Sequence, residues 1–228
     1  MPIFGRKPVP EPPSTPDEWR PQKFGAGRRA IRDAVIEPSW SGVRVLARLS
    51  GDATRFTDED GVDCTEEFAD AAAAITAAAL AGDFVLDGFL TVEATQDITG
   101  KPMADLPTPT KGQVMTAWIA GDRLAPPTAP KRELDPDRPI AFVAVDLLSI
   151  DGTVLLDIPL LERKRLLDGA LTPSELVRIT PFVRPPIGNF LNTWRGIGFR
   201  ALAYKAVNSR YTPDQRNDDW SILPMPLN

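Results

Sequence analysis

The sequence contains no histidine among its 228 residues and only one cysteine, Cys64. The missing histidine excludes Ser-His and Cys-His catalytic pairs and any histidine-containing zinc site, so the remaining chemistry must use Asp, Glu, Lys, Tyr, Ser or backbone groups. A lone cysteine cannot form an internal disulfide. Cys64 is therefore expected to be a small apolar filler in a protein of a reducing compartment.

Long hydrophobic runs are also missing. No stretch approaches the roughly 18 uncharged apolar residues that a membrane span needs, and the N-terminus has no apolar signal region. A cytoplasmic protein without membrane contact is expected. Acidic residues outnumber basic ones by 31 to 26, and this balance argues against a surface built to hold a polyanion, so DNA binding is expected to be weak or absent.

The first thirty residues differ from the rest because prolines forbid helix and interrupt strand pairing there. The segment also carries more basic than acidic side chains. Residues 1–30 are predicted to form a Pro-rich basic extended tail, either a solvated leader or a docking arm for a protein partner. Residues 31–228 are predicted to form the folded domain.

Apolar patterning predicts strands and helices joined by connections of uneven length. The predicted strands are 43–49, 84–86 and 90–92 with a break at Asp87-Gly88, 140–149, 201–207 and 220–223. The predicted helices are 67–80, 111–120, 160–171 with the charged residues 162–165 facing out, and 190–195. Uneven connections favour a mixed antiparallel α+β fold over a doubly wound sheet.

Four short segments occur in a fixed order. They are Glu37-Pro38-Ser39-Trp40-Ser41-Gly42-Val43-Arg44, then Val85-Leu86-Asp87-Gly88-Phe89, then 142–148 with Asp151-Gly152, and finally 201–205 with Tyr211 and Trp220. Together they resemble the nucleotidyltransferase (adenylation) domain of ATP-dependent DNA ligases, particularly the bacterial repair type, over residues 31–224. The resemblance implies two antiparallel β-sheets flanked by helices. Because the chain ends at Asn228, the OB-fold domain of that family is expected to be absent.

The resemblance also implies that the covalent chemistry is lost. In the family, a lysine of the first segment attacks the α-phosphate of ATP to give lysyl-AMP, and an aspartate follows it. These positions are Ser39 and Ser41, whereas Glu37, Gly42 and Arg44 are retained. A serine without a neighbouring base is a poor nucleophile.

Other charged positions of the family are replaced as well. A carboxylate is Phe89, an arginine-bearing loop is 58–61 with acidic residues, the aromatic that stacks on adenine is Val145, a glutamate is Arg200, and two phosphate-contacting lysines are Ile222 and Pro224. By resemblance, the remaining candidates for binding a nucleotide are Glu37, Trp40, Arg44 and Lys205. No catalytic and no metal-binding residue is expected.

Several residues keep a second reading. Asp87, Asp146 and Asp151 could form a metal cluster, although two of them precede glycine as in ordinary turns. Trp40 and Trp220 could line a ligand site or be buried between the sheets. Lys205 could be a relocated nucleophile or make a surface ion pair. The remaining lysines considered are expected to be solvated: Lys23, Lys101, Lys111, Lys131 and Lys164.

The main hypothesis is a catalytically degenerate ATP-dependent DNA ligase-like protein that acts as a non-catalytic binding or scaffold module linked to DNA repair. A protein partner would bind the tail or the old cleft, and no cofactor is expected. One alternative is a residual ATP- or AMP-binding protein without turnover, in which ATP, AMP or Mg²⁺ would still bind. Another is an active DNA ligase with an unconventional nucleophile.

Overall fold

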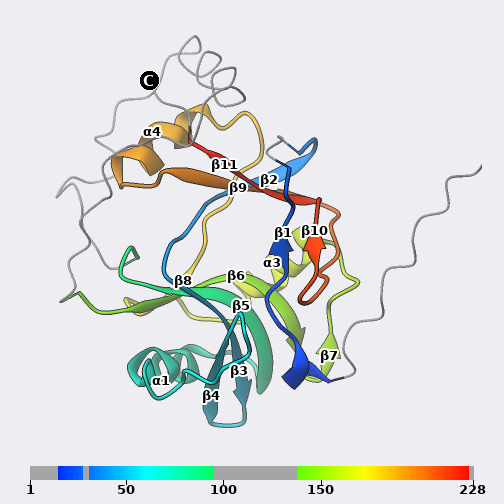
Figure 1. Cartoon of the computed structure of the whole chain (residues 1–228). Helices are drawn as coiled ribbons and strands as arrows, with labels where there is room; N and C mark the ends of the chain where they lie inside the picture. The colour runs from blue at the N-terminus through cyan, green and yellow to red at the C-terminus, as the bar shows by residue number, and fades with distance from the viewer. Residues whose placement is uncertain (1–14, 28–30, 95–137, 226–228) are drawn as a thin grey trace, which may run out of the picture.

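The computed structural model describes residues 15–27, 31–94 and 138–225. The predicted helix 111–120 and the lysines Lys101, Lys111 and Lys131 lie outside this part of the chain. Two β-sheets form separate layers, a larger one and a smaller one (Figure 1). The mixed α+β fold with antiparallel sheets and few helices is confirmed, and the described residues contain no OB-fold.

The larger sheet has the strand order β4-β3-β5-β6-β7, with β8 paired to β6. Its strands are β3 (Val43–Ser50), β4 (Ala53–Asp58), β5 (Asp83–Thr91), β6 (Ala141–Ile150), β7 (Thr153–Val154) and β8 (Val177–Ile179). All neighbours are antiparallel except β8, which runs parallel to β6. Apolar and β-branched residues fill β5 and β6, as strands buried on both faces require.

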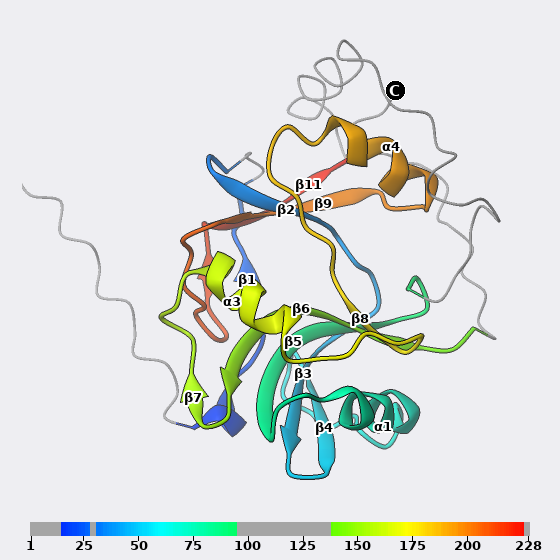
Figure 2. The same cartoon turned by 180° about the vertical axis from the view of Figure 1, so that it is seen from behind.

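The smaller sheet is fully antiparallel. It has the order β11-β9-β2, with β2 (Ala34–Pro38), β9 (Ala201–Ala206) and β11 (Trp220–Pro224). Helix α4 (Gly188–Gly196) covers its outer face, and Figure 2 shows α4 on the side away from the larger sheet. Leu191 and Trp194 of α4 pack into one cluster with Ile36 and Leu202 of the sheet.

The predicted break at Asp87-Gly88 is wrong, because β5 continues from Asp83 to Thr91 with a register irregularity between these two residues. A side chain at Gly88 would place its Cβ 2.4 Å from the Phe142 ring. The glycine is therefore needed for close packing of β5 on β6 and not for a turn.

Helix α3 (Leu160–Asp168) confirms a predicted helix, but the expected outward direction of residues 162–165 is wrong for two of them. Arg163 and Lys164 are 0% and 2% exposed. Both cations are buried because each reaches a buried carboxylate, Asp146 for Arg163 and Glu37 for Lys164. Helix α1 (Ala69–Ala78) was also predicted and packs against the larger sheet.

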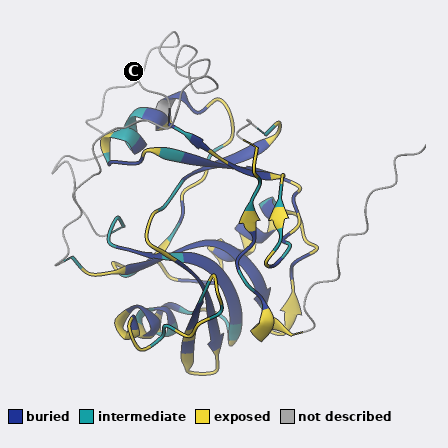
Figure 3. Ribbon diagram, in the orientation of Figure 1, coloured by how far each residue is buried: buried dark blue, intermediate teal, exposed yellow. Residues whose placement is uncertain are grey.

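Residues 15–27 pack on the body of the molecule. The short helix η1 (Pro16–Glu18) precedes Trp19, which is buried, and β1 (Lys23–Phe24) pairs with β10 (Arg216–Asn217) as a small parallel sheet. Figure 3 shows exposed residues at both ends of this stretch and buried ones between them. Within the extended tail predicted for residues 1–30, Trp19 and Phe24 therefore pack into the core, and residues 1–14 and 28–30 lie outside the described part of the chain. No helix in the described ranges is long and apolar enough to cross a membrane.

Candidate functional site

A cleft of about 200 Å³ lies between the two sheets. Most positions singled out by the sequence meet there, although they come from strands far apart in the chain. Its lining comprises Phe24, Glu37, Pro38, Ser39, Trp40, Gly42, Arg44, Glu59, Phe89, Val145, Ala203, Lys205 and Ile222. Ser41, Arg200 and Pro224 are not part of this lining.

Glu37, near the end of β2, lines the cleft and forms ion pairs with two lysines, Lys205 of the same lining and Lys164 of α3. Its carboxylate oxygens lie 2.5 Å from Nζ of Lys164 and 3.0 Å from Nζ of Lys205. All three side chains are buried, with exposed fractions of 1–2%. The expected surface ion pair of Lys205 is an ion pair, but it is internal. The prediction that Lys164 is solvated is wrong.

The two lysines are fixed by further contacts. Lys164 Nζ donates a hydrogen bond to the carbonyl of Val145 at 2.6 Å, and Lys205 Nζ lies 4.3 Å from the centre of the Trp220 ring. Burial lowers the pKa of Lys164, and the neighbouring charge of Lys205 lowers it further, against the opposing effect of Glu37. A buried lysine that lacked Glu37 would lose its compensating charge.

Arg44 on β3 is held in the same way. Its Nε and Nη2 donate hydrogen bonds to the two carboxylate oxygens of Asp87 at 3.1 and 2.7 Å, and the Tyr211 hydroxyl donates to Asp87 at 2.9 Å. Burial alone lowers the pKa of Arg44, but the attraction of Asp87 outweighs it and the net shift is upward. The rings of Phe24 and Phe89 lie 5.6 and 5.8 Å from its guanidinium carbon.

The three aspartates considered as a metal cluster have separate partners. Asp87 binds Arg44, and Asp146 receives hydrogen bonds from Nε and Nη2 of Arg163 at 2.9 and 2.8 Å. Asp151 accepts hydrogen bonds from the backbone N–H groups of Gly82 and Asp83. Within the described part of the chain, no group of three acidic, cysteine or histidine side chains is arranged to hold a metal ion.

The segment after β2 carries Ser39, which the sequence resemblance aligns with the family lysine. The backbone N–H of Ser39 donates to the carbonyl of Ala201, and the N–H of Ser41 donates to the Glu93 carboxylate at 2.8 Å. The indole N–H of Trp40 donates to the Thr180 hydroxyl at 2.9 Å, and its ring meets Phe199 edge-on. Trp40 therefore lines the cleft while partly buried, and Trp220 is fully buried beneath Lys205.

Three contributors to this region were missed from the sequence. Phe24 lay in the assumed tail, Glu93 follows β5, and Lys164 was assigned to an exposed helix face. A signal for Lys164 was present, because positions 160, 164 and 167 share one face of a helix and the flanking two are leucines. The sequence does not reveal that the carboxylate of Glu37 lies opposite that face.

Comparisons with known proteins agree on the family. The family model described as ATP dependent DNA ligase domain matches residues 27–221. DNA ligase 1 of Korarchaeum cryptofilum is 27% identical over 202 residues, covering 85% of this chain and 34% of that protein. A probable DNA ligase of Streptomyces coelicolor is 29% identical over 194 residues, covering 82% of this chain and 34% of that protein. The chain thus spans about a third of the length of these relatives.

Two solved structures share the fold. Mycobacterial DNA ligase D complexed with ATP and MES is 23% identical, with a TM-score of 0.61, and the match covers 91% of this chain and 60% of that one. The ligase domain of LigD from M. tuberculosis is 20% identical, with a TM-score of 0.59 over the same shares. At these identities, the likeness establishes the architecture of the two facing sheets.

Proposed function

The chain belongs to the ATP-dependent DNA ligase domain family, and from that premise we propose that it is a catalytically degenerate member that forms no lysyl-AMP. Its cleft would serve a non-catalytic binding or scaffold role for a protein partner, in a pathway of DNA repair. The observation that carries this proposal is that the buried lysines near the cleft are ion-paired inside the protein. By the sequence resemblance Ser39 stands at the position of the family nucleophile, and Glu37 forms ion pairs with both Lys205 of the cleft lining and the buried Lys164 behind it.

A lysine that attacks the α-phosphate of ATP must present an amine in line with the leaving pyrophosphate. Lys205 faces the cleft, but its amine is bound by Glu37 and lies against the Trp220 ring. Lys164 is directed at Glu37 and the Val145 carbonyl. For Lys205 or Lys164 to act as the nucleophile, its buried ion pair with Glu37 would have to break. This cost favours loss of activity over an unconventional nucleophile.

The charges of the cleft give a second argument. Two cations, Arg44 and Lys205, and two carboxylates, Glu37 and Glu59, line it. Each cation is already paired with a buried carboxylate. A triphosphate needs positive groups that are free to contact its oxygens, so binding of ATP is disfavoured here.

Two experiments test the proposal together. In calorimetric titration with ATP and Mg²⁺, we expect no heat of binding at millimolar nucleotide. With a nicked DNA duplex, ATP and Mg²⁺, we expect no sealed product. Heat that saturates without sealing would support the residual nucleotide-binding alternative, and sealing that disappears in Lys205→Ala would support the active ligase instead.

A further inference from the structure

Two carboxylates at the edge of the cleft have no salt-bridge partner in the described part of the protein, although the charge of Glu59 is near enough to contribute to the raised pKa of Arg44. Glu59 lines the cleft, and Glu93 lies beside it with its carboxylate on the N–H of Ser41. Among residues 15–27, 31–94 and 138–225, neither carboxylate forms a salt bridge. Lys23, a cation of β1, is bound to Asp214 at 2.7 Å.

Aromatic rings form much of the wall. Phe24, Trp40 and Phe89 come from β1, from the segment after β2 and from β5. The cleft already holds two internal cations by combining a ring with a carboxylate. Arg44 lies near the rings of Phe24 and Phe89 and forms an ion pair with Asp87. Lys205 lies over the ring of Trp220 and forms an ion pair with Glu37. Aromatic faces attract cations through their negative centres, most strongly where water is excluded.

Of the three aromatic rings that line the cleft, Trp40 is the one without a cation over its face among the described residues, and it adjoins Ser41, whose N–H donates to Glu93. Its orientation is set by the hydrogen bond from its indole to Thr180. A ring of fixed orientation, with carboxylates at the edge of the cleft, repeats the combination that holds the two internal cations. The cavity of about 200 Å³ is smaller than the roughly 300–1,000 Å³ of typical small-molecule sites, so it suits a single side chain.

We propose that the cleft binds one arginine or lysine side chain of a basic segment in a partner protein. The aliphatic stem would contact the apolar wall, and the charged head would lie between Trp40 and the carboxylates of Glu59 and Glu93. This inference rests on the proposed non-catalytic role, since a cleft that binds a triphosphate would have the opposite charge requirement. A nucleic acid is disfavoured for the same reason, because its phosphates would meet the two carboxylates.

The test is a titration of the full chain with the peptide acetyl-Gly-Arg-Gly-amide, in the absence of ATP. The same peptide with lysine, glutamine or glutamate at its centre provides the comparison series. Binding is followed through the NMR signal of the Trp40 indole N–H, assigned with the variant Trp40→Phe. We expect saturable shifts with arginine and lysine, and none with glutamine or glutamate.

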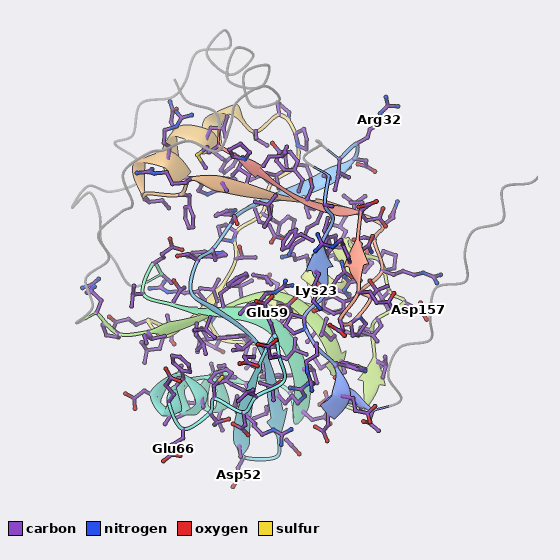
Figure 4. The ribbon with its side chains drawn as sticks, in the orientation of Figure 1. Lys23, Arg32, Asp52, Glu59, Glu66 and Asp157 are labelled. Carbon is purple, nitrogen blue, oxygen red and sulfur yellow. The ribbon has the colours of Figure 1, made fainter. Side chains whose placement is uncertain are left out.

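A matched pair of variants locates the site. Figure 4 shows Glu59 near the middle of the molecule, between the two sheets, and Glu66 near α1, at the end of the molecule away from the smaller sheet. Both side chains are exposed, so either can be changed to glutamine without disturbing the core. We expect Glu59→Gln to weaken binding of the arginine peptide about three- to fivefold, as loss of one exposed charge partner does. Glu66→Gln should leave the affinity unchanged.

Equal effects of the two variants, equal binding of the glutamate peptide, or no shift at millimolar arginine peptide would overturn the inference. So would shifts produced by a single-stranded oligonucleotide in place of the basic peptides. These results are separate from a failure of the proposed function, which is read from covalent adenylate or sealed DNA. A chain that forms lysyl-AMP but binds no basic peptide refutes both proposals, whereas an inert chain that binds no peptide refutes this inference alone.

Discussion

At the scale of single residues, Glu37 decides the electrostatics of the cleft. Among the described residues it is the carboxylate that forms ion pairs with both buried lysines, and its removal would leave both ammonium groups without that partner. The sequence drew attention to Glu37 only through resemblance to a family motif. Its role as a double counter-ion depends on Lys164 and Lys205, which lie far away in the chain and which no local pattern links to it.

We predict that Glu37→Gln destabilises the protein by about 3–5 kcal/mol, the usual loss when one partner of a buried ion pair is removed. Glu162→Gln is the control, because Glu162 forms an exposed pair with Arg165 and should cost at most about 1 kcal/mol. Urea denaturation at neutral pH measures both values. Equal midpoints for the two variants would contradict the assigned role of Glu37.

Asp146 makes a prediction about acid stability. Burial alone would raise its pKa, but the charge and hydrogen bonds of Arg163 outweigh burial and hold the pKa below its usual value of 3.8. A carboxyl whose pKa is depressed on folding contributes stability that is complete above the unfolded value and is lost as the pH falls through the folded value.

We therefore expect Asp146→Asn to be less stable than the parent at about pH 7, and the difference to shrink below pH 3.8. Denaturant midpoints measured across the acid range test this. Asp157→Asn is the control, since Asp157 pairs with Arg210 at the exposed surface and should show almost no pH-dependent difference (Figure 4). A difference for Asp146→Asn that persists unchanged in acid would argue against the buried ion pair.

At the scale of secondary structure, the strongly apolar strands and the alanine-rich helix follow from the sequence. The strands that were missed are β1, β2, β4, β7, β8 and β10, which have two to six residues each. Their residues lack a long apolar run, and their conformation follows from pairing, with the preceding strand for β4 and β7 and with distant strands for β1, β2, β8 and β10. Asp87-Gly88 was wrongly predicted to be a break in the strand. An Asp-Gly pair is typical of turns, but a glycine within a strand also permits a side chain of the neighbouring strand to approach closely.

Gly88 gives the prediction at this scale. Gly88→Ala is expected to destabilise the protein by about 1–3 kcal/mol, because the new methyl group would overlap the Phe142 ring and the carbonyl of Val143. Gly82→Ala is the matched control, since its methyl group would meet only Asp151 at 3.5 Å. Thermal unfolding of the two variants distinguishes a packing requirement from a general effect of losing glycine.

The N-terminal segment gives another prediction about stability. Trp19 is 2% exposed and packs with Trp220 and Tyr211, and the carbonyls of Pro16 and Trp19 accept hydrogen bonds from Arg48. Trp19→Ala should therefore cost about 3–5 kcal/mol. A midpoint unchanged in urea would mean that residues 15–24 do not belong to the packed body.

At the scale of the whole molecule, the two facing sheets form a cleft whose two lining cations, Arg44 and Lys205, are both ion-paired inside the protein. Apolar residues that build the sheets resemble those of the family, and the cleft between the sheets persists with Trp40 and Arg44 in it. The sequence indicated this architecture and most of the cleft lining through ordered motifs. It gave no indication that every cation lining the cleft is bound to a carboxylate, because such pairing depends on the relative placement of the two sheets.

The most direct test of the central claim is intact mass spectrometry of the full chain after incubation with ATP and Mg²⁺, alongside an active ATP-dependent DNA ligase as positive control. We predict that the control gains one adenylate and that this chain keeps its unmodified mass. The variant Ser39→Lys should also remain unmodified, because the sequence resemblance places other residues at the remaining charged positions of the family as well. An adenylate adduct on the unaltered chain, mapped by peptide digestion to Lys205 or Lys164, would contradict the claim that the cleft has lost its covalent chemistry.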